Sequence, residues 1–319
     1  MTSPQPMLPP LFLARYRFQF TVTRPIHLPD WSGSLLRGAF GHALRRLSCM
    51  LRQPECADCP LLRTCPYPAI FAPPAVEHEI QRFSQPPAPY LMEPEKWGAC
   101  TLQTGETLQF DMVLMGRALR ELPLIIEAWK NAAQHGLGAG EGTAQLREIF
   151  YLPPQNSPVS MYSPENKRLV EISLQPVICP SIAQIDELTL RFISPLRLQE
   201  DGHPLSVERL TPGALLLAAV RRAALIHNLY GNGTPDWDFK ALAQQAASVE
   251  GEKNLHWRDW TRRSARQKQT MQLGGVMGDW KLRGDLQAFF PALHLGTWLH
   301  VGKETVFGLG RYTLEYNNA

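Results

Sequence analysis

One plan of elements occurs twice along this chain of 319 residues, and it restricts the possible folds more than any other feature. Residues 14–30 alternate apolar and polar side chains and then reach prolines, which predicts a strand and a turn. Residues 188–202 repeat the pattern, and in both halves a helix, a Gly-Leu-Gly turn and a closing strand are expected to follow. The repetition predicts two α+β domains, each a split β-α-β-β-α-β sheet.

The domain boundary is expected near residues 178–186, which gives an N-terminal domain over 1–180 and a C-terminal domain over 181–319. The first predicted helix runs from about Ser34 to Leu47, and the second begins at Thr211-Pro212, a cap residue and a first-turn proline. Residues 254–280 are interpreted as a helix followed by a hairpin broken by glycines. The proline-rich stretches 73–94 and 153–164 are expected to be loops or insertions.

Charge is concentrated in two segments, although the formal net charge of the chain is only +3. Residues 256–283 hold seven Lys or Arg and two Asp, and residues 35–52 hold four Arg and no acid. Such segments fit either solvated faces or a surface for nucleic acid. No apolar run reaches the roughly 18 residues of a membrane span, and the proline-rich start does not resemble a secretory signal. A cytoplasmic protein with reduced cysteines is therefore expected.

Glycines crowd the C-terminal segment HVGKETVFGLGRY, residues 300–312. Glycine lets backbone N–H groups approach a phosphate closely, and Lys303 places a cation next to Gly302. The spacing matches neither the Walker loop nor the dinucleotide-binding fingerprint. The alternative interpretation is a tight turn between a helix and an edge strand.

Several segments together resemble the RAMP superfamily of CRISPR systems, and within it the endoribonucleases that process pre-crRNA. The segments are SLLRGAFGHALRRLSC, the cysteine-rich insert that follows it, WTRRSARQ, LGGVMG and HVGKETVFGLGRY. The resemblance covers nearly the whole chain and implies tandem ferredoxin-like domains with a C-terminal glycine-rich loop. It departs from the family pattern at His300, where the first glycine of a Gly-x-Gly pair is expected.

The resemblance also implies an activity, namely metal-independent cleavage of CRISPR repeat RNA. The 2′-hydroxyl attacks the adjacent phosphate, leaving a 2′,3′-cyclic phosphate and a 5′-hydroxyl end, and the products serve as guide RNAs. No Asp/Glu cluster with the spacing of a metal-dependent nuclease is apparent, so EDTA should not inhibit the reaction. The alternative is a non-catalytic RNA-binding subunit of a CRISPR effector complex, and other effector subunits are possible partners in either case.

His42 occupies the family position of a histidine on the first helix that takes part in catalysis. A helical wheel places it off the apolar stripe, with Gly38, Arg45 and Arg46, and the two arginines should disfavour the imidazolium form. His42 would then serve as a general base. The alternative is an exposed histidine without a role. Other candidates for catalysis are Lys303, Tyr16, His300 and Arg37.

Basic residues from three segments are expected to contact RNA. On the interpreted helix over 256–269, arginines form one row and Trp257 and Trp260 another; the tryptophans are assigned to the core and the arginines to RNA phosphates. The alternative leaves the arginines as a solvated face. The full predicted set is Arg37, Arg45, Arg46, Arg258, Arg262, Arg263, Arg266, Lys268, His300, Gly302, Lys303, Gly308, Gly310 and Arg311.

Four of the six cysteines, Cys49, Cys56, Cys59 and Cys65, fall within 17 residues. In a reducing compartment this spacing favours a metal over disulfides, and a closed site of four cysteines is typical of structural zinc. A [4Fe–4S] cluster is the second possibility, and four unbound thiols the third. Cys100 and Cys179 are expected to be core residues. A structural, non-catalytic metal is predicted.

Overall fold

The computed structural model describes residues 8–74, 86–95, 97–138, 142–163, 165, 168–264 and 269–316, with the backbone alone for 262–264 and 269–272. The chain divides into two compact units. The N-terminal unit is Phe12–Gln175, and the C-terminal unit is Pro176–Ala319 together with the segment before Phe12. An isolated bridge between Leu11 and Val177 attaches that segment to the C-terminal unit, whereas the sequence assigned it to the first domain.

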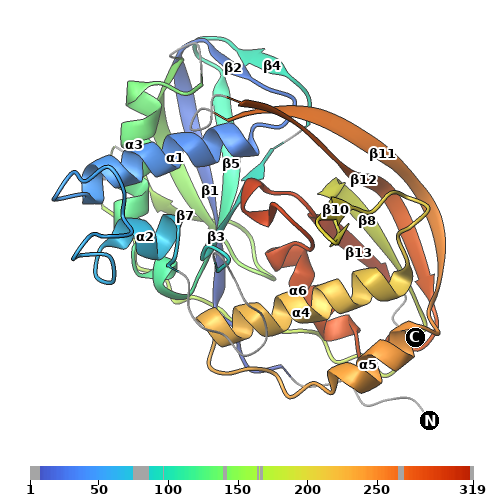
Figure 1. The fold of residues 1–319 in the computed structure, drawn as a ribbon. Helices are drawn as coiled ribbons and strands as arrows, with labels where there is room; N and C mark the ends of the chain where they lie inside the picture. Colours follow the sequence, from blue (N-terminus) through green and yellow to red (C-terminus); the bar gives the residue numbers. More distant parts are fainter. Residues whose placement is uncertain are drawn as a thin grey trace. The chain divides into compact units, whose positions relative to one another are not determined.

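The N-terminal unit contains an antiparallel five-stranded sheet with the order β3-β5-β1-β6-β7 (Figure 1). Without β7, this is the strand order of a split β-α-β-β-α-β sheet. A small second sheet pairs β2 with β4. The strands are β1 (Leu13–Arg24), β2 (Ile26–Leu28), β3 (Tyr90–Pro94), β4 (Cys100–Leu102), β5 (Thr107–Met115), β6 (Thr143–Leu152) and β7 (Val159–Tyr162).

Strand β1 confirms the alternation of the sequence, because Tyr16, Phe18 and Phe20 are buried and the residues between them are half-buried. The helices of this unit are α1 (Gly33–Ser48), α2 (Pro66–Phe71), the 3-10 turn η1 (Gly116–Leu119) and α3 (Leu122–His135). Helix α1 matches the predicted one to within a residue at each end. Helices α1 and α3 pack side by side, and Trp129 of α3 stacks on Phe40 of α1 and contacts Phe110 of β5 with its ring tilted.

Strands β3 and β7 lie in stretches that the sequence assigned to loops, so that interpretation is wrong for both. Strand β3 ends at Pro94 and pairs only with β5, at the edge of the sheet. An edge strand tolerates proline because one side of its backbone makes no ladder hydrogen bonds. The prolines of this stretch therefore led the sequence analysis to miss β3, an edge strand of the core sheet.

The C-terminal unit repeats the frame with a four-stranded antiparallel sheet of order β11-β12-β8-β13. Its strands are β8 (Glu187–Leu196), β9 (Gln199–Glu200), β10 (His203–Pro204), β11 (Glu250–Ser264), β12 (Gln269–Arg283) and β13 (Tyr312–Tyr316). Its helices are α4 (Pro212–Tyr230), α5 (Phe239–Ala246), α6 (Phe290–Leu299) and the 3-10 turn η2 (Thr305–Phe307). The tandem ferredoxin-like fold predicted from the sequence is confirmed.

Local chemistry fixes the start of α4 as predicted. The Thr211 hydroxyl accepts a hydrogen bond from the Ala214 amide at 3.1 Å, and Pro212 occupies the first turn. The helix ends before Gly231. No helix in the described part of the chain is both long enough and apolar enough to cross a membrane.

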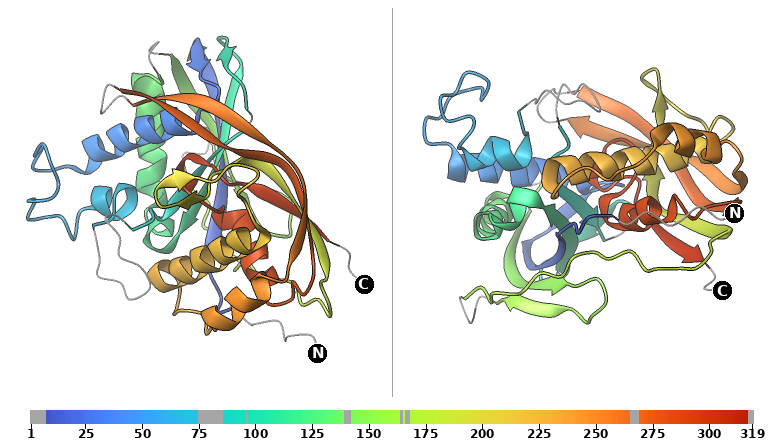
Figure 2. Two further views of the ribbon diagram at one scale, coloured as in Figure 1. Left: turned by 45° about the vertical axis from the view of Figure 1, so that its right-hand side comes forward. Right: turned by 90° about the horizontal axis from the view of Figure 1, so that it is seen from below.

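Residues 254–280 do not begin with a helix, which corrects the sequence interpretation. Strands β11 and β12 form one long hairpin, drawn in orange in Figures 1 and 2. Helix propensity was overridden by pairing, because β12 also hydrogen-bonds to β8 in the middle of the sheet.

Candidate RNA-processing site

The exposed face of helix α1 carries the principal catalytic candidate. His42 and Arg46, one turn apart, are both exposed, and the half-buried Gly38 lies one turn before His42. The opposite side of the helix is buried and includes Phe40 and Leu44. A methyl group at Gly38 would meet no atom within 4 Å. This face therefore places an imidazole and a guanidinium next to an open stretch of backbone.

A second row of α1, formed by Arg37, Gly41 and Arg45, faces the segment that follows the helix. The Arg37 guanidinium lies 4.2 Å from the centre of the Phe71 ring, and a methyl group at Gly41 would lie 2.3 Å from the same ring. Glycine at 41 thus lets α2 pack against α1. Arg37 and Arg45 were both predicted to contact RNA, and the structure places them against α2 and the cysteine-rich loop.

Arg45 holds that loop by its backbone. Its guanidinium donates hydrogen bonds to the carbonyl oxygens of Gln53 and Pro54, at 2.7 Å for Pro54. Its charge also lies 5.8 Å from the centre of the Tyr67 ring. The helical wheel grouped Arg45 with His42, but the structure separates them. Of the two arginines that follow His42, only Arg46 shares its face.

Tyr16, a predicted catalytic residue, is buried in β1 with 2% of its surface exposed. Burial raises the pKa of its hydroxyl well above the usual value, and the nearby Tyr151 adds to the effect. A phenol that is held neutral and away from solvent cannot exchange protons with a bound RNA. The structure therefore corrects this assignment.

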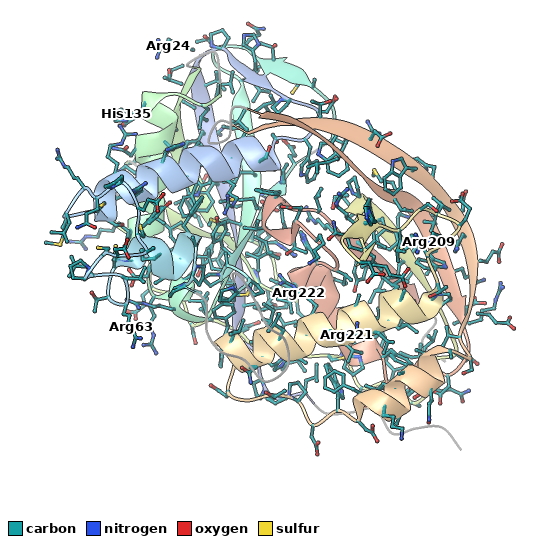
Figure 3. The ribbon with its side chains drawn as sticks, viewed as in Figure 1. Arg24, Arg63, His135, Arg209, Arg221 and Arg222 are labelled. Atoms are coloured by element: carbon teal, nitrogen blue, oxygen red, sulfur yellow. The ribbon has the colours of Figure 1, made fainter. Side chains whose placement is uncertain are left out.

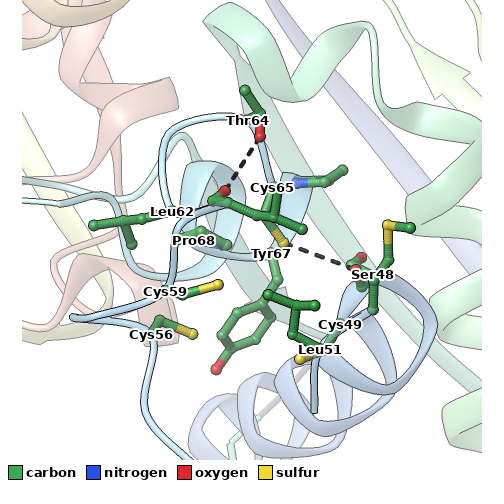
Figure 4. Close-up of a pocket in the computed structure, with 13 residues that line it drawn as sticks. Ser48, Cys49, Leu51, Cys56, Cys59, Leu62, Thr64, Cys65, Tyr67 and Pro68 are labelled. Atoms are coloured by element: carbon green, nitrogen blue, oxygen red, sulfur yellow. Dashed lines mark hydrogen bonds between the residues drawn. The ribbon is translucent and has the colours of Figure 1, made fainter. Parts of the chain in front are cut away.

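The four clustered cysteines line one cavity of about 160 Å³ in the loop between α1 and α2 (Figure 4). All are half-buried free thiols. The Cys65 thiol is 3.8 Å from the carbonyl oxygen of Ser48, the last residue of α1. Burial raises the pKa of the Cys56 thiol, against a lowering by the Arg45 charge. Among the described residues no three metal-binding side chains are gathered closely enough to hold an ion as they stand. Four thiols facing one cavity are nevertheless a chemically suitable donor set.

The glycines near the C-terminus fit the loop to its own unit. Gly310 has φ +70°, and a methyl group there would lie 1.8 Å from the Val301 carbonyl oxygen. Gly302 has φ +97°, and its methyl group would lie 2.6 Å from the Arg197 carbonyl oxygen. Gly308 and Gly310 are buried, and their amides donate to the carbonyls of Thr305 and Pro195. The structure thus contradicts the prediction that Gly308 and Gly310 contact RNA, whereas Gly302 is half-exposed.

Of the other loop residues, His300 is fully buried and Lys303 is exposed. The His300 backbone has φ +56°, and its amide donates to the Gly296 carbonyl at the end of α6. A buried imidazole cannot meet RNA, so that prediction is corrected. The Lys303 amide donates to the Arg197 carbonyl at 2.8 Å, which fixes the backbone below an exposed ammonium group. Arg311 is half-buried, and its amide donates to the Ser194 hydroxyl.

Arg222 supports the loop, and sequence reasoning missed it. From α4 its guanidinium donates to the Leu299 carbonyl at 3.3 Å and to the Thr305 hydroxyl at 3.1 Å (Figure 3). Burial lowers the pKa of this arginine to about 10. Arg222 thereby joins the end of α6 to η2, on both sides of Lys303. The only signal in the sequence was an arginine pair inside an apolar helix.

Residues 256–264 lie in strand β11, so the rows of side chains predicted for a helix are not formed there. Trp257 and Trp260 lie three residues apart and so on opposite faces of β11, with Trp260 6% and Trp257 36% exposed. The core assignment holds for Trp260 only. The Trp257 indole donates to the Asp259 carboxylate at 2.8 Å, and its ring covers Gly274.

The predicted RNA-binding residues of this segment are only partly described. Arg258 is exposed in β11. Arg262 and Arg263 lie in β11 with the backbone alone described, and Arg266 and Lys268 lie outside the described residues. The predicted contacts of these five residues with RNA stay predictions.

Part of the positive charge of residues 256–283 is neutralised within the sheet. Lys281 and Arg283 of β12 both contact the Glu187 carboxylate, at 2.7 and 2.8 Å, and Arg283 also pairs with Glu252. These hydrogen bonds lower the pKa of Glu187. The charge count from the sequence therefore overstated the positive charge that this stretch has available to bind a polyanion such as RNA.

Two family models match the chain. Residues 8–174, more than half of it, match AF_1859_N, described as an N-terminal domain, and residues 190–312 match the CRISPR-associated endoribonuclease Cas6. No curated protein matches. Among solved structures, 49 chains match.

Three of these solved structures illustrate the likeness. A Cas6 product complex has a TM-score of 0.57 at 13% identity, covering 95% of this chain and 99% of the other. The same protein, Thermus thermophilus Cas6, also matches on its own, with a TM-score of 0.53, 14% identity, and coverage of 96% and 99%. A partial Cas6-RT-Cas1–Cas2 complex has a TM-score of 0.56 at 14% identity, and there 98% of this chain spans 47% of the other.

Identities this low show a shared fold, and the family models add membership. The first matched range covers nearly all of the N-terminal unit, and the second lies within the C-terminal unit. Residues 190–312 therefore form a domain of the CRISPR-associated endoribonuclease Cas6 family, and the chain as a whole shares the fold of the solved Cas6 structures.

Proposed function

We propose that this protein cleaves CRISPR repeat RNA without a catalytic metal and so produces guide RNAs. The 2′-hydroxyl oxygen forms a bond to the adjacent phosphorus while the bond from phosphorus to the 5′-oxygen breaks. A base takes the proton of the 2′-hydroxyl, and an acid protonates the departing 5′-oxygen. The products carry a 2′,3′-cyclic phosphate and a 5′-hydroxyl.

The exposed face of α1 carries the proposal. His42 is an exposed imidazole in a family of endoribonucleases, and histidine is the side chain that most often transfers protons near neutral pH. Arg46, one helical turn away, can pair with the scissile phosphate. Gly38, one turn before His42, has no side chain to hold the RNA backbone away from the imidazole. We assign the general base to His42 and phosphate binding to Arg46.

RNA binding extends to basic groups of the C-terminal unit. Lys303 is exposed on a backbone fixed by the Arg197 carbonyl, and Gly302 before it is half-exposed. Arg258 is exposed on β11 of the long hairpin, and Arg266 and Lys268 follow it in the sequence, outside the described residues. Contacts of this kind recognise the phosphates and shape of an RNA stem more than its bases. Lys303 is the second candidate for stabilising the charge that develops at phosphorus.

The test is cleavage of a labelled CRISPR repeat RNA in EDTA, with the cut position then blocked by a 2′-deoxy substitution. We expect a product with a cyclic phosphate end that disappears with the deoxy RNA. His42→Ala should slow single-turnover cleavage by about 100-fold or more, the usual range for loss of a general acid or base. His135→Ala is the matched control, since His135 is also an exposed helical histidine of the same unit.

Other outcomes separate the parts of the proposal. Cleavage that needs a divalent metal, or that survives the deoxy substitution, contradicts the mechanism. Equal rates for His42→Ala and the control move the assignment to Lys303. Tight binding of an uncut RNA by the unaltered protein indicates a non-catalytic RNA-binding subunit of an effector complex.

A further inference from the structure

We propose that Cys49, Cys56, Cys59 and Cys65 bind one Zn²⁺ ion, which fastens the end of α1 to the start of α2. The site is separate from RNA cleavage, and no step of the proposed reaction uses it. Cys49 directly follows α1, and its amide donates to the Arg45 carbonyl at 2.8 Å. Cys65 directly precedes α2. The two outer cysteines thus belong to the ends of two helices.

The inner pair lies on a turn that points toward the same cavity. The Cys59 amide donates to the Cys56 carbonyl at 3.1 Å, and the Leu62 amide donates to the Cys59 carbonyl at 2.9 Å. Figure 4 shows both thiols of this turn on the side that faces α1. The Cys65 amide donates to the Leu61 carbonyl at 2.8 Å, so successive turns carry the chain from the inner pair to the fourth cysteine.

The loop has no apolar core of its own to hold its shape. Residues 49–65 contain no helix or strand, and Figure 2 shows them projecting beyond the end of α1. Their large apolar side chains include Met50, 83% exposed, and Leu51, 48% exposed. The four cysteines, by contrast, are each half-buried around one cavity of about 160 Å³. A loop without a core is the usual place for a structural metal to supply the folding energy.

Donor chemistry and charge favour zinc. The cavity is lined by four thiols and no carboxylate or imidazole, a set typical of closed tetrahedral zinc sites. Four thiolates around Zn²⁺ carry a net charge of about −2, which favours a cation nearby. Arg45 supplies one, since its guanidinium holds the Gln53 and Pro54 carbonyls of the same loop. Zinc would draw the four sulfur atoms together toward the centre of the cavity.

The position of the site indicates its effect. Helix α2 places Phe71 against Gly41 and under Arg37 of α1. Zinc therefore fixes the helix that covers one side of α1, while His42 and Arg46 remain exposed on another. Loss of the ion should loosen α2 and expose the Gly41 side of α1.

The test is the metal content of the full chain after purification without chelators. We expect about one zinc per chain, with four sulfur neighbours at about 2.3 Å in X-ray absorption spectra of the unaltered protein. The Cys56→Ser/Cys59→Ser double variant should lose the zinc. The matched control, Cys100→Ser/Cys179→Ser, changes the two remaining cysteines and should keep the zinc. Both are half-buried, whereas the sequence predicted them in the core.

The spectra of the unaltered protein keep the test decisive even if the double variant fails to fold. Iron with sulfide in place of zinc overturns the proposal in favour of an iron–sulfur cluster. Three other results also overturn the proposal: zinc bound through nitrogen or oxygen, zinc lost equally from both double variants, and six reactive thiols without any metal.

Discussion

Helices α1 and α4 occupy the same place in the two units, each after the first strand of a split β-α-β-β-α-β sheet, but the histidine of α4, His227, is buried and that of α1, His42, is exposed. In α4 the polar side chains that turn inward bond to the unit itself: Arg222 bonds to the Leu299 carbonyl, and His227 bonds to the Ala223 carbonyl. In α1, His42 and Arg46 are exposed. The same position in the fold thus carries a histidine bonded within its unit in one case and an exposed histidine in the other.

The two Gly-Leu-Gly turns differ in a similar way. Gly138 is exposed at φ +80°, and the nearest atom to a methyl group there would be the end of the Leu35 side chain, at 3.1 Å. Gly310 is buried at φ +70° against the Val301 backbone. The last glycine of each tripeptide has a left-handed backbone, which favours glycine, but the first glycines differ, with ψ 134° at Gly136 and 12° at Gly308. Only the second turn is also closely packed, and it lies beside the exposed Lys303.

Exchanging glycine for alanine in the two turns gives the largest expected difference in stability. Gly310→Ala should lower the free energy of unfolding by about 3 kcal/mol, since left-handed backbone strain adds to overpacking against Val301. Gly138→Ala should cost about 1 kcal/mol, for the strain alone. Urea unfolding followed by tryptophan fluorescence measures both. Equal losses would show that the second turn is no more tightly packed than the first.

The adjacent arginines of α4, labelled in Figure 3, test its supporting role. Arg222→Met should lower the free energy of unfolding by about 2 kcal/mol, because hydrogen bonds from a charged donor to Leu299 and Thr305 are lost. Arg221 is exposed, so Arg221→Met should change stability by less than about 0.5 kcal/mol. Hydrogen exchange at residues 300–311 should rise in the first variant only. A similar effect of both variants would contradict the assigned role of Arg222.

The sequence predicted the elements whose signals are local. Alternation gave β1, and the Thr211-Pro212 pair gave the start of α4. The segment 256–269 was misread because Arg, Lys and Gln favour helices locally, while long-range pairing with β8 through β12 decides the structure. Strand β3 was missed because prolines surround it, although an edge strand accommodates them.

For the site, the sequence predicted exposure better than burial. The helical wheel placed His42 and Arg46 off the apolar stripe, and both are exposed. The alternation in β1 already placed Tyr16 on the same face as Phe18 and Phe20, so its burial could have been predicted, whereas the burial of His300 depends on elements distant in the chain. Arg222 was missed because nothing local distinguishes it from Arg221. Periodicity identifies the face of a helix, whereas the partner of a side chain depends on tertiary packing.

The smallest effect separates the two faces of α1 by means of its two interior glycines. Gly38→Ala should raise the free energy of unfolding by about 0.5–1 kcal/mol, because alanine favours a helix and the added methyl group meets nothing within 4 Å. Gly41→Ala should lower it instead, because its methyl group would lie 2.3 Å from the Phe71 ring. If RNA lies along the exposed face, Gly38→Ala should also slow RNA cleavage, although the variant is more stable. Thermal unfolding and single-turnover cleavage, measured on one preparation, report the two effects. A more stable variant with unchanged cleavage would mean that the RNA backbone does not approach α1 at Gly38. The scissile phosphate would then have to approach His42 from the C-terminal side of this residue on the helix.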